Sequence, residues 1–333
     1  MEYRRLGGSG LKVSALSFGA WVTFGEQVGD DIARDLMRTA REAGVNFFDN
    51  AETYADGGAE TMMGRVIQQL GWKRSDLVLS TKIFWGGTGP NDRGLSHKHI
   101  VEGTLAALDR LQTSYVDLIF CHRPDLDTPI EETVRAMNHL INRGLAFYWG
   151  TSEWSADQIR DAYGVARREH LVPPTMEQPQ YNMFTRERVE KEYARLYDDI
   201  GLGLTTFSPL ASGNLAGKYL EGVPKGTRLD TAGYEYLRKQ LDTPRGRERI
   251  EKVKQLIPIA HELGASMAQL AIAWAVRNPR VSTVITGASR PAQISENMKA
   301  MELSRKLGPD VLARIEAVLG NRPAEPTDFR LSN

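Results

Sequence analysis

Cysteine is almost absent from this sequence, and neither sign of charge is in excess. Cys121 is the single cysteine in 333 residues, so no disulfide can form within the chain, which suits a reducing compartment. Since Cys121 lies in the apolar run VDLIFC, we expect a buried, unreactive thiol rather than a nucleophile. Lys plus Arg and Asp plus Glu each number 42, so the formal net charge is +0 and nothing indicates a nucleic-acid partner.

Long hydrophobic runs are missing as well. No stretch approaches the roughly 20 apolar residues that cross a bilayer. The first residues, MEYRRLGGSGLKVS, lack the apolar core of a signal peptide. We therefore expect a soluble, cytoplasmic protein without direct insertion into a membrane.

Short apolar runs alternate with amphipathic helical patterns along the chain. Predicted strands cover residues 15–20, 46–49, 77–82, 116–120, 146–150, 175–178, 202–207 and 282–286. Predicted helices between them include 30–44, 96–111, 128–144, 155–170 and 186–201. In the first of these helices, Ile32, Leu36, Met37 and Ala40 are predicted to form one buried face.

Alternation of strands with helices predicts a parallel sheet, and eight strands are the number that closes a (β/α)₈ barrel. An open, doubly wound sheet is the alternative, but no G-x-G-x-x-G motif follows the first strand and no shift in composition divides the chain. We predict a single barrel domain over residues 1–333. An N-terminal β-hairpin around residues 7–10 would plug it, and a long irregular segment, 208–233, follows the seventh strand.

Polar side chains stand at the ends of three consecutive predicted strands. Asp49 ends the second strand, and Tyr54 follows on its loop. Lys82 ends the third strand, and His122 follows the fourth. In a barrel these strand ends lie on one face, which carries the chemistry, and neighbouring strands are about 4.8 Å apart. We therefore predict that the four side chains share one site.

These residue types suit the donation of a proton to an oxygen atom. A phenol has a pKa of about 10, and a lysine ammonium beside it could lower that pKa by roughly 1–3 units. Asp49 would neutralise and position Lys82, and His122 could hydrogen-bond a substrate carbonyl. A carbonyl that accepts hydride becomes an alkoxide and needs such a proton. Because no side chain supplies hydride, a nicotinamide cofactor and a small carbonyl substrate are predicted.

Other interpretations stay open at this point. Asp49 and Lys82 alone would make a structural ion pair at the barrel rim, and Asp49 with a second carboxylate would suit a hydrolase, although no partner acid stands at a strand end. His97 and His99 invite a metal site, but no third ligand is near them in the sequence, so we predict solvated histidines and no metal. Trp85 follows Lys82 into a glycine loop and is expected to line the substrate pocket.

The segment VITGASRPAQISENM (284–298) runs from the eighth predicted strand through Gly287 into a helix. Backbone N–H groups at a helix start attract phosphate, and Ser289 and Arg290 would add a hydroxyl and a fixed charge. Gln293 and Asn297 lie one helical turn apart on one face, as adenine contacts would. An ordinary polar helix start is the alternative.

The segments FFDNAETYADGGAE, STKIFW and LIFCHRPD resemble the tetrad segments of the aldo-keto reductase superfamily, and the resemblance covers nearly the whole chain. GAWVTFG, TKIFWGG and EQPQYNMF are similar, more narrowly, to the branch containing the β subunits of voltage-gated potassium channels and their plant and bacterial relatives. The resemblance implies a (β/α)₈ barrel, NADP(H) bound in extended form, and reduction of aldehydes or ketones. It gives Asp49, Tyr54, Lys82 and His122 the tetrad roles, with Tyr54 as the proton donor.

The resemblance also implies a set of cofactor contacts. Segment 284–298 would hold the 2′-phosphate and adenine, with Arg290 favouring NADP over NAD. Phe207 would stack on the nicotinamide where channel subunits commonly carry tryptophan, and Ser152 and Gln178 would hold its carboxamide. The positions carried over for the pyrophosphate and for the floor of the site are Ser208, Leu210, Ser212, Gly213, Lys218, Arg228, Trp21 and Gln27. The segment after the seventh strand is thus expected to cover the cofactor.

The same branch implies a rival function, a redox-sensing regulatory subunit of a potassium channel, and it suggests a homotetramer. Animal channel subunits of this branch carry Asn where this chain has His122, so we expect a fuller catalytic set here. The sequence begins at Met1 directly before the predicted hairpin, so we expect no N-terminal extension able to block a channel pore. A channel partner has no direct support in the sequence, and the enzyme is the leading hypothesis.

Overall fold

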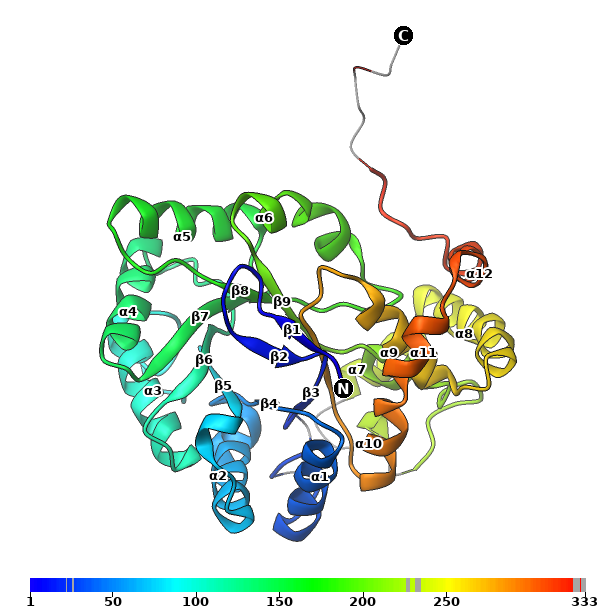
Figure 1. The fold of residues 1–333 in the computed structure, drawn as a ribbon, viewed down its shortest axis with the longest axis horizontal. Helices are drawn as coiled ribbons and strands as arrows, with labels where there is room; N and C mark the ends of the chain where they lie inside the picture. Colours follow the sequence, from blue (N-terminus) through cyan, green and yellow to red (C-terminus); the bar gives the residue numbers. More distant parts are fainter. Residues whose placement is uncertain (22, 26, 226–227, 231–234, 326–329, 331–333) are drawn as a thin grey trace.

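Parallel strands close into an eight-stranded barrel in the computed structural model of the chain (Figure 1). The structure describes residues 1–21, 23–25, 27–225, 228–230, 235–325 and 330. The barrel strands are β3 (Leu16–Gly19), β4 (Phe47–Asp49), β5 (Val78–Ile83), β6 (Val116–Cys121), β7 (Ala146–Ser152), β8 (Met176–Gln178), β9 (Gly203–Thr206) and β10 (Thr283–Thr286). Each strand pairs with the next, and β10 returns to pair with β3, Val284 opposite Leu16. The predicted barrel is confirmed, and the open sheet is wrong.

A hairpin of β1 (Tyr3–Arg5) and β2 (Lys12–Ser14) closes the end of the barrel at which the strands begin. Its Leu6 and Val13 are fully buried in one cluster with residues from the barrel interior, Phe47, Val78, Leu118, Phe120, Met176 and Ile285. At Gly7, φ is +56° and a Cβ atom would lie 2.3 Å from the carbonyl oxygen of Gly201, so only glycine fits there. The predicted plug is therefore present.

Helices surround the barrel in Figure 1. They are α1 (Asp30–Glu42), α2 (Gly58–Leu70), α3 (His97–Leu111), α4 (Ile130–Asn142), α5 (Ala156–Arg168), α6 (Ala194–Asp199), α7 (Glu235–Leu241), α8 (Pro244–Glu262), α9 (Met267–Arg277), α10 (Pro291–Met298), α11 (Ala300–Lys306) and α12 (Pro309–Leu319). In α1, Ala33 rather than Ile32 completes the buried face with Leu36, Met37 and Ala40. Ile32 is 45% exposed because it lies about 100° around the helix from Ala33.

Two predicted segments have more internal structure than the sequence patterns indicated. The helix predicted over 186–201 is interrupted, because Arg188–Glu192 forms a π-helical turn, η3, before α6 begins. The irregular segment after β9 contains two short 3₁₀ helices, η4 (Ala211–Ala216) and η5 (Arg228–Asp230). The described part of this segment therefore contains tight turns rather than a plain loop.

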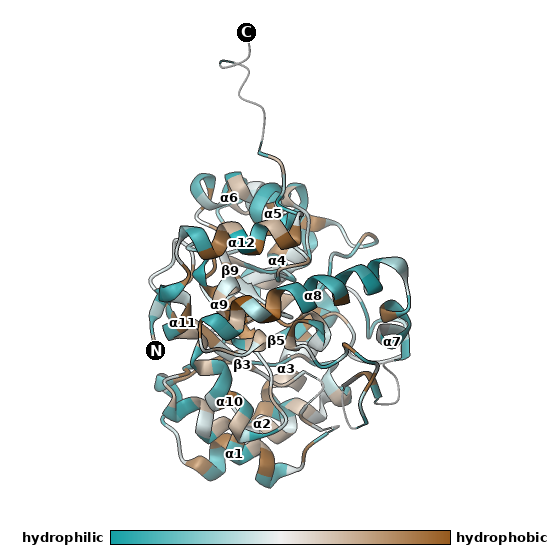
Figure 2. Ribbon diagram, turned by 90° about the vertical axis from the view of Figure 1, so that its right-hand side faces the viewer, coloured by the Kyte–Doolittle hydropathy of each residue, from teal (hydrophilic) through white to brown (hydrophobic). Residues whose placement is uncertain are grey.

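Within the described residues, no single helix is long and apolar enough to cross a membrane. Helices α8 and α9 pass that test only when they are joined, and they are bent by 87° at the break between them. Helix α9 is buried along most of its length, whereas much of α8 is hydrophilic in Figure 2.

Candidate active site

The barrel brings the four strand-end residues to one place. Asp49 is the last residue of β4, Lys82 precedes the last residue of β5, and His122 directly follows β6. Tyr54 opens the 3₁₀ helix η1 (Tyr54–Gly57) on the loop after β4. Since neighbouring parallel strands end on the same face of a barrel, all four side chains belong to the mouth at the carboxyl ends of the strands.

Lys82 is the centre of this group. Its side chain is fully buried, and its Nζ donates hydrogen bonds to Asp49 Oδ2 at 2.7 Å, to the carbonyl oxygen of Asn50 at 2.7 Å and to Tyr54 Oη at 3.0 Å. An ammonium has three N–H donors, so each of them has a partner. The carboxylate of Asp49 offsets the cost of burying the positive charge.

Asp49 is itself held in place. Its Oδ1 accepts hydrogen bonds from Ser80 Oγ at 2.7 Å and from Gln178 Nε2 at 3.1 Å. Both oxygens of the carboxylate are therefore occupied, one by Lys82 and the other by neutral donors. Because Gln178 ends β8, this contact ties opposite walls of the barrel together beneath the site.

Burial raises the pKa of Tyr54 above its usual value, and the carboxylate of Asp49 adds to this rise, whereas the ammonium of Lys82 opposes it. Lys82 thus acts in the expected direction, but burial outweighs it and the net direction is upward. Burial also acts to lower the pKa of Lys82, but Asp49 and Tyr54 raise it on balance. At neutral pH the phenol thus keeps its proton and the amine keeps its charge.

His122 is buried beside the phenol. Burial lowers the pKa of His122 well below its usual value, and the positive charges of Lys82 and Arg123 add to the effect. The imidazole is therefore neutral at pH 7. Its ring centroid lies 5.9 Å from that of Tyr54 and 5.0 Å from that of Trp85. Its Nδ1 is buried and has no hydrogen-bond partner among the described residues.

A cavity of about 850 Å³ opens above these side chains. The residues predicted for the site that line it are Trp21, Gln27, Asp49, Tyr54, Trp85, His122, Ser152, Gln178, Phe207, Ser208, Leu210, Ser212, Gly213, Lys218, Gly287, Ser289, Arg290, Gln293 and Asn297. Their roles toward a ligand stay predictions. The barrel nevertheless brings together side chains that come from all parts of the sequence.

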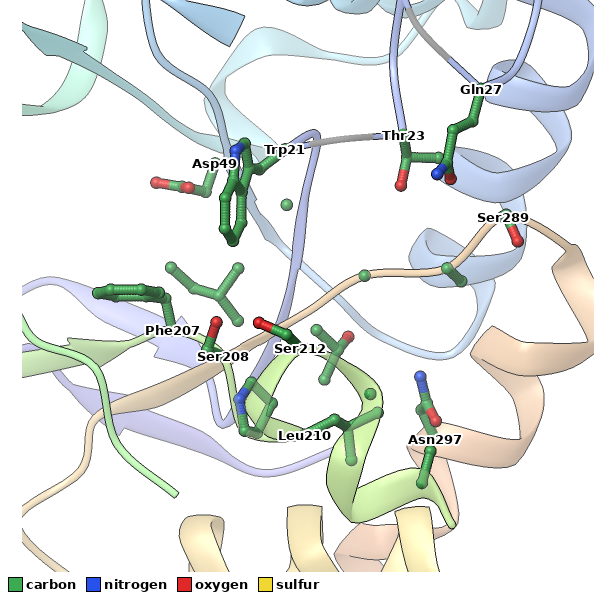
Figure 3. A pocket seen from close by; sticks show the side chains of 18 of the residues that line it. Trp21, Thr23, Gln27, Asp49, Phe207, Ser208, Leu210, Ser212, Ser289 and Asn297 are labelled. Carbon is green, nitrogen blue, oxygen red and sulfur yellow. The ribbon is translucent and has the colours of Figure 1, made fainter. Parts of the chain in front are cut away.

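The lining residues of the cavity form two groups. In Figure 3, Asp49, Trp21 and Phe207 lie at one side of it, and Gln27, Ser289 and Asn297 lie at the other. The first group contains the tetrad aspartate, and the second stands around the start of α10. We call these the catalytic end and the α10 end.

At the α10 end, Gln293 already has internal partners. Its Oε1 accepts hydrogen bonds from the backbone N–H of Ser289 at 2.9 Å and from that of Arg290 at 3.2 Å. The amide oxygen is therefore used to fix the turn before α10, and only its NH₂ group remains to meet a ligand. Arg290 is exposed, and no carboxylate in the described part of the chain pairs with it.

Two predicted site residues do not line the cavity. Lys82 is covered and contacts the cavity through Tyr54 and Asp49, which suits its predicted role of tuning the phenol. Arg228 begins η5, but its side chain lies outside the described residues.

Several lining residues were not predicted from the sequence. They are Gly19, Thr23, Thr53, Arg123, Pro209, Ala216, Tyr219, Pro224, Lys225, Ile272, Ile285, Thr286 and Ala288. Most of them lie within two residues of a predicted residue in the chain, so proximity in the sequence was the available signal. Ile272 is different, because it reaches the cavity from α9, a helix with no polar motif toward the site.

Backbone strain gathers in the loops around the mouth. Among the described residues, positive φ angles at non-glycine positions occur at Ala55, Asp56, Glu153, Ser208, Ala211 and Ser212 in these loops, and elsewhere at Gln112 and His170. Each such angle costs on the order of 1–3 kcal/mol and persists only where surrounding contacts enforce it. Concentration of strain after β4, β7 and β9 is typical of a functional site.

One of the two histidines differs from its prediction, because His97 is exposed as expected and His99 is not. His99 is not solvated but 5% exposed, and its Nε2 lies 3.1 Å from Glu52 Oε1. Glu52 also accepts a hydrogen bond from the backbone N–H of Phe84 at 2.5 Å, so it joins the loops that carry Tyr54 and Trp85. No three metal-ligating side chains gather anywhere in the described residues.

The single cysteine is fully buried, as expected. Burial raises the pKa of Cys121 well above its usual value, and the nearby Glu177 carboxyl adds to the rise. A thiol in this state is a poor nucleophile.

Comparison with known proteins defines the family. A model of the Aldo/keto reductase family matches residues 15–319. The chain belongs to the aldo/keto reductase family. It is 58% identical over 333 residues to a protein of Arabidopsis thaliana described as a "Probable voltage-gated potassium channel subunit beta", with 99% of this chain and 100% of the relative covered. A protein of Oryza sativa subsp. japonica with the same description is 56% identical over the same lengths. Within the family, the match therefore extends to the β-subunit-like branch.

Proposed function

We propose that this aldo/keto reductase converts aldehydes and ketones to alcohols by hydride transfer from NADPH, with Tyr54 as the proton donor. The observation that carries the proposal is the hydrogen bond of 3.0 Å between Lys82 Nζ and Tyr54 Oη at the edge of the large cavity. Membership of the family supports oxidoreductase chemistry in general.

The proton transfer follows from the geometry and charges of the tetrad. When bound, NADPH supplies hydride to the carbonyl carbon of the substrate. Tyr54 donates its phenolic proton to the carbonyl oxygen, so the O–H bond of the alcohol forms as the O–H bond of the phenol breaks. Lys82 stabilises the phenolate that remains, because its ammonium is already in hydrogen-bond contact with that oxygen.

His122 and Trp85 orient the carbonyl. The neutral imidazole can donate a ring N–H to the carbonyl oxygen without competing for the proton of Tyr54. Trp85 packs edge-on against this imidazole and forms a wall of the pocket that excludes water. Both side chains thus hold the oxygen near the phenol during the transfer.

The cavity fits an extended dinucleotide. It runs from the catalytic end to the α10 end, and Ser152, Gln178 and Phe207 lie at the catalytic end where a nicotinamide ring would be held. At the other end, the first turn of α10 and the exposed Arg290 guanidinium suit the 2′-phosphate of NADP. This arrangement supports NADPH over NADH.

Replacement of the phenol tests the proposal. Tyr54→Phe keeps the ring and removes only the proton donor, so we expect carbonyl reduction to fall by about 100-fold or more. The Kd for NADPH, measured by fluorescence titration, should stay within twofold. Tyr3→Phe is the matched control, because Tyr3 is an exposed tyrosine on the hairpin whose hydroxyl donates a hydrogen bond to the carbonyl oxygen of Gly44. Full activity in Tyr54→Phe would overturn the assignment.

A potassium-channel subunit is the second candidate function, and the descriptions of the two plant relatives favour it. A binding measurement between the purified chain and the cytoplasmic domain of a plant potassium channel separates the two. Tight binding together with no NADPH oxidation on a panel of aldehydes and ketones would favour the subunit. Turnover of carbonyls would favour the enzyme, because His122 completes a catalytic set.

A further inference from the structure

A second cavity, of about 300 Å³, lies beside the first. The residues that line both cavities are Trp21, Arg123, Phe207, Ser208 and Ser212. Ser289 and Arg290 of the α10 end line only the first cavity. The second cavity therefore branches from the catalytic end, away from the segment proposed for the 2′-phosphate. We call it the side cavity.

Two arginines line the side cavity. Arg123 directly follows His122 and donates hydrogen bonds to the carbonyl oxygen of His122 at 2.5 Å and to Ser152 Oγ at 3.2 Å. Arg249 belongs to α8, and its guanidinium carbon lies 5.2 Å from the ring centroid of Phe184. Each is half-buried, and neither pairs with a carboxylate within the part of the chain that the structure describes.

The carboxylate that lines the same cavity is already occupied. Glu153 Oε2 lies 3.0 Å from Arg188 Nη1, and Glu153 Oε1 accepts a hydrogen bond from the backbone N–H of Gln180 at 2.6 Å. The negative charge of Glu153 is thus paired with Arg188, which does not line the side cavity. The walls of the side cavity are left with two guanidinium groups and no free acid from the described residues.

The surroundings of Arg249 add to the positive potential. Burial and the like charge of Arg245 lower the pKa of Arg249, against a smaller opposing effect of Glu248. On the other side, the charge of Arg123 contributes to keeping His122 neutral. A partly desolvated guanidinium is stabilised by an anion, and its planar donors match a carboxylate in two-point contact.

We propose that the side cavity is a subsite for a carboxylate group on the substrate, so that the enzyme prefers carbonyl compounds which carry a carboxylate. This proposal rests on the proposed reductase function. The carbonyl lies at Tyr54 and His122, and the rest of the substrate passes Arg123 so that its carboxylate meets Arg249. Nothing is transferred at the subsite, which acts through binding alone.

A matched pair of aldehydes tests the subsite. 4-Carboxybenzaldehyde and methyl 4-formylbenzoate have the same shape near the carbonyl and differ in charge. In Arg249→Gln, the ratio of kcat/KM for the acid to kcat/KM for the ester should fall about tenfold or more, since hydrogen bonds to charged groups are worth that much. Arg247→Gln is the control, because Arg247 is an exposed arginine on α8 that does not line the side cavity. In this variant the ratio should not change.

Three results would overturn the subsite. The ratio could stay unchanged in Arg249→Gln, or fall equally in both variants, which would indicate a general field effect. The Kd for NADPH could rise in Arg249→Gln while the ratio holds, which would mean that Arg249 serves a cofactor phosphate.

If the wild-type chain reduces neither aldehyde, the proposed reductase function fails, but the subsite can still be tested by a direct binding measurement. Terephthalate is then titrated calorimetrically against the wild type and both variants. Loss of terephthalate binding in Arg249→Gln alone supports the subsite. Equal binding in all three proteins, or no binding in any of them, refutes it.

Discussion

Lys82 is the residue on which the charges of the site depend. It is fully buried and holds both Asp49 and Tyr54 through hydrogen bonds. The sequence places these residues at strand ends, and this was sufficient to predict their meeting. It does not give the depth of burial, which is why the upward direction of the pKa of Tyr54 could not be predicted.

Replacement of Lys82 separates its chemical role from its structural one. In Lys82→Met, carbonyl reduction should fall at least about 100-fold, because the phenolate loses its stabilising charge. The free energy of unfolding should fall as well, by about 3–5 kcal/mol, since the Asp49 carboxylate is left buried without its partner. The double variant Asp49→Asn/Lys82→Met should regain stability in urea unfolding while turnover stays lost. Recovery of turnover in the double variant would contradict the role of Lys82.

Glu177 should make stability depend on pH. Burial raises the pKa of Glu177 from 4.5 to about 8, and only one of its carboxyl oxygens has a partner, the hydroxyl of Thr151. The folded state therefore holds a proton that the unfolded chain releases near pH 4.5. The stability due to this proton is complete below that pH and is lost as pH rises toward about 8.

The variant Glu177→Gln removes this titration. Relative to the variant, the wild type should lose up to about 1.4 kcal/mol of unfolding free energy per pH unit across that range. Urea unfolding at pH 5, 6.5 and 8 measures the difference. Glu302→Gln is the control, because Glu302 is exposed; its unfolding free energy should change with pH in the same way as that of the wild type. If the unfolding free energy of Glu177→Gln also follows the wild type across this pH range, Glu177 does not titrate there.

At the scale of elements, the residues that mark the start of a helix predict more of the structure than the hydrophobic pattern does. Helix α9 was not predicted, although Ser266 and Gln269 have the spacing of a capping box. In the structure the backbone N–H of Gln269 donates to Ser266 Oγ at 3.2 Å, and the backbone N–H of Ser266 donates to Gln269 Oε1 at 2.9 Å. The π-helical turn Arg188–Glu192, which interrupts the predicted helix before α6, has no comparable signal in the sequence.

Removal of this cap tests how much it stabilises α9. Ser266→Ala should lower the free energy of unfolding by about 1 kcal/mol, because an N–H group at the helix start loses its partner. Ser266→Asn keeps a capping oxygen and should restore most of the loss. Neither change should alter kcat/KM, since Ser266 is exposed and lines neither cavity. A loss that Asn does not restore would indicate a different contact.

For the whole molecule, the sequence predicted the closed barrel and the tetrad because both follow from order along the chain. Alternating strands and helices allow few topologies, and strand ends in a barrel share one face. The side cavity cannot be predicted from the order of strands and helices along the chain. Arg123 and Arg249 meet there from the loop after β6 and from α8, and Ile272 enters the main cavity from α9. Such long-range packing has no periodic signal in the sequence.

The proposed cofactor site also joins distant parts of the molecule, so binding of NADPH should stabilise the whole barrel. Gly213 and Lys218 come from the segment after β9, and Arg290 from the turn before α10. NADPH at 100 times its Kd should add about 2.7 kcal/mol to the unfolding free energy by mass action. In Arg290→Ala, the shift in melting temperature caused by NADPH should shrink markedly, while the shift caused by NADH should not. Arg305→Ala, an exposed arginine on α11, should leave both shifts unchanged. If both shifts shrink equally in Arg290→Ala, Arg290 contacts a part common to the two dinucleotides, and the preference for the 2′-phosphate must come from another residue.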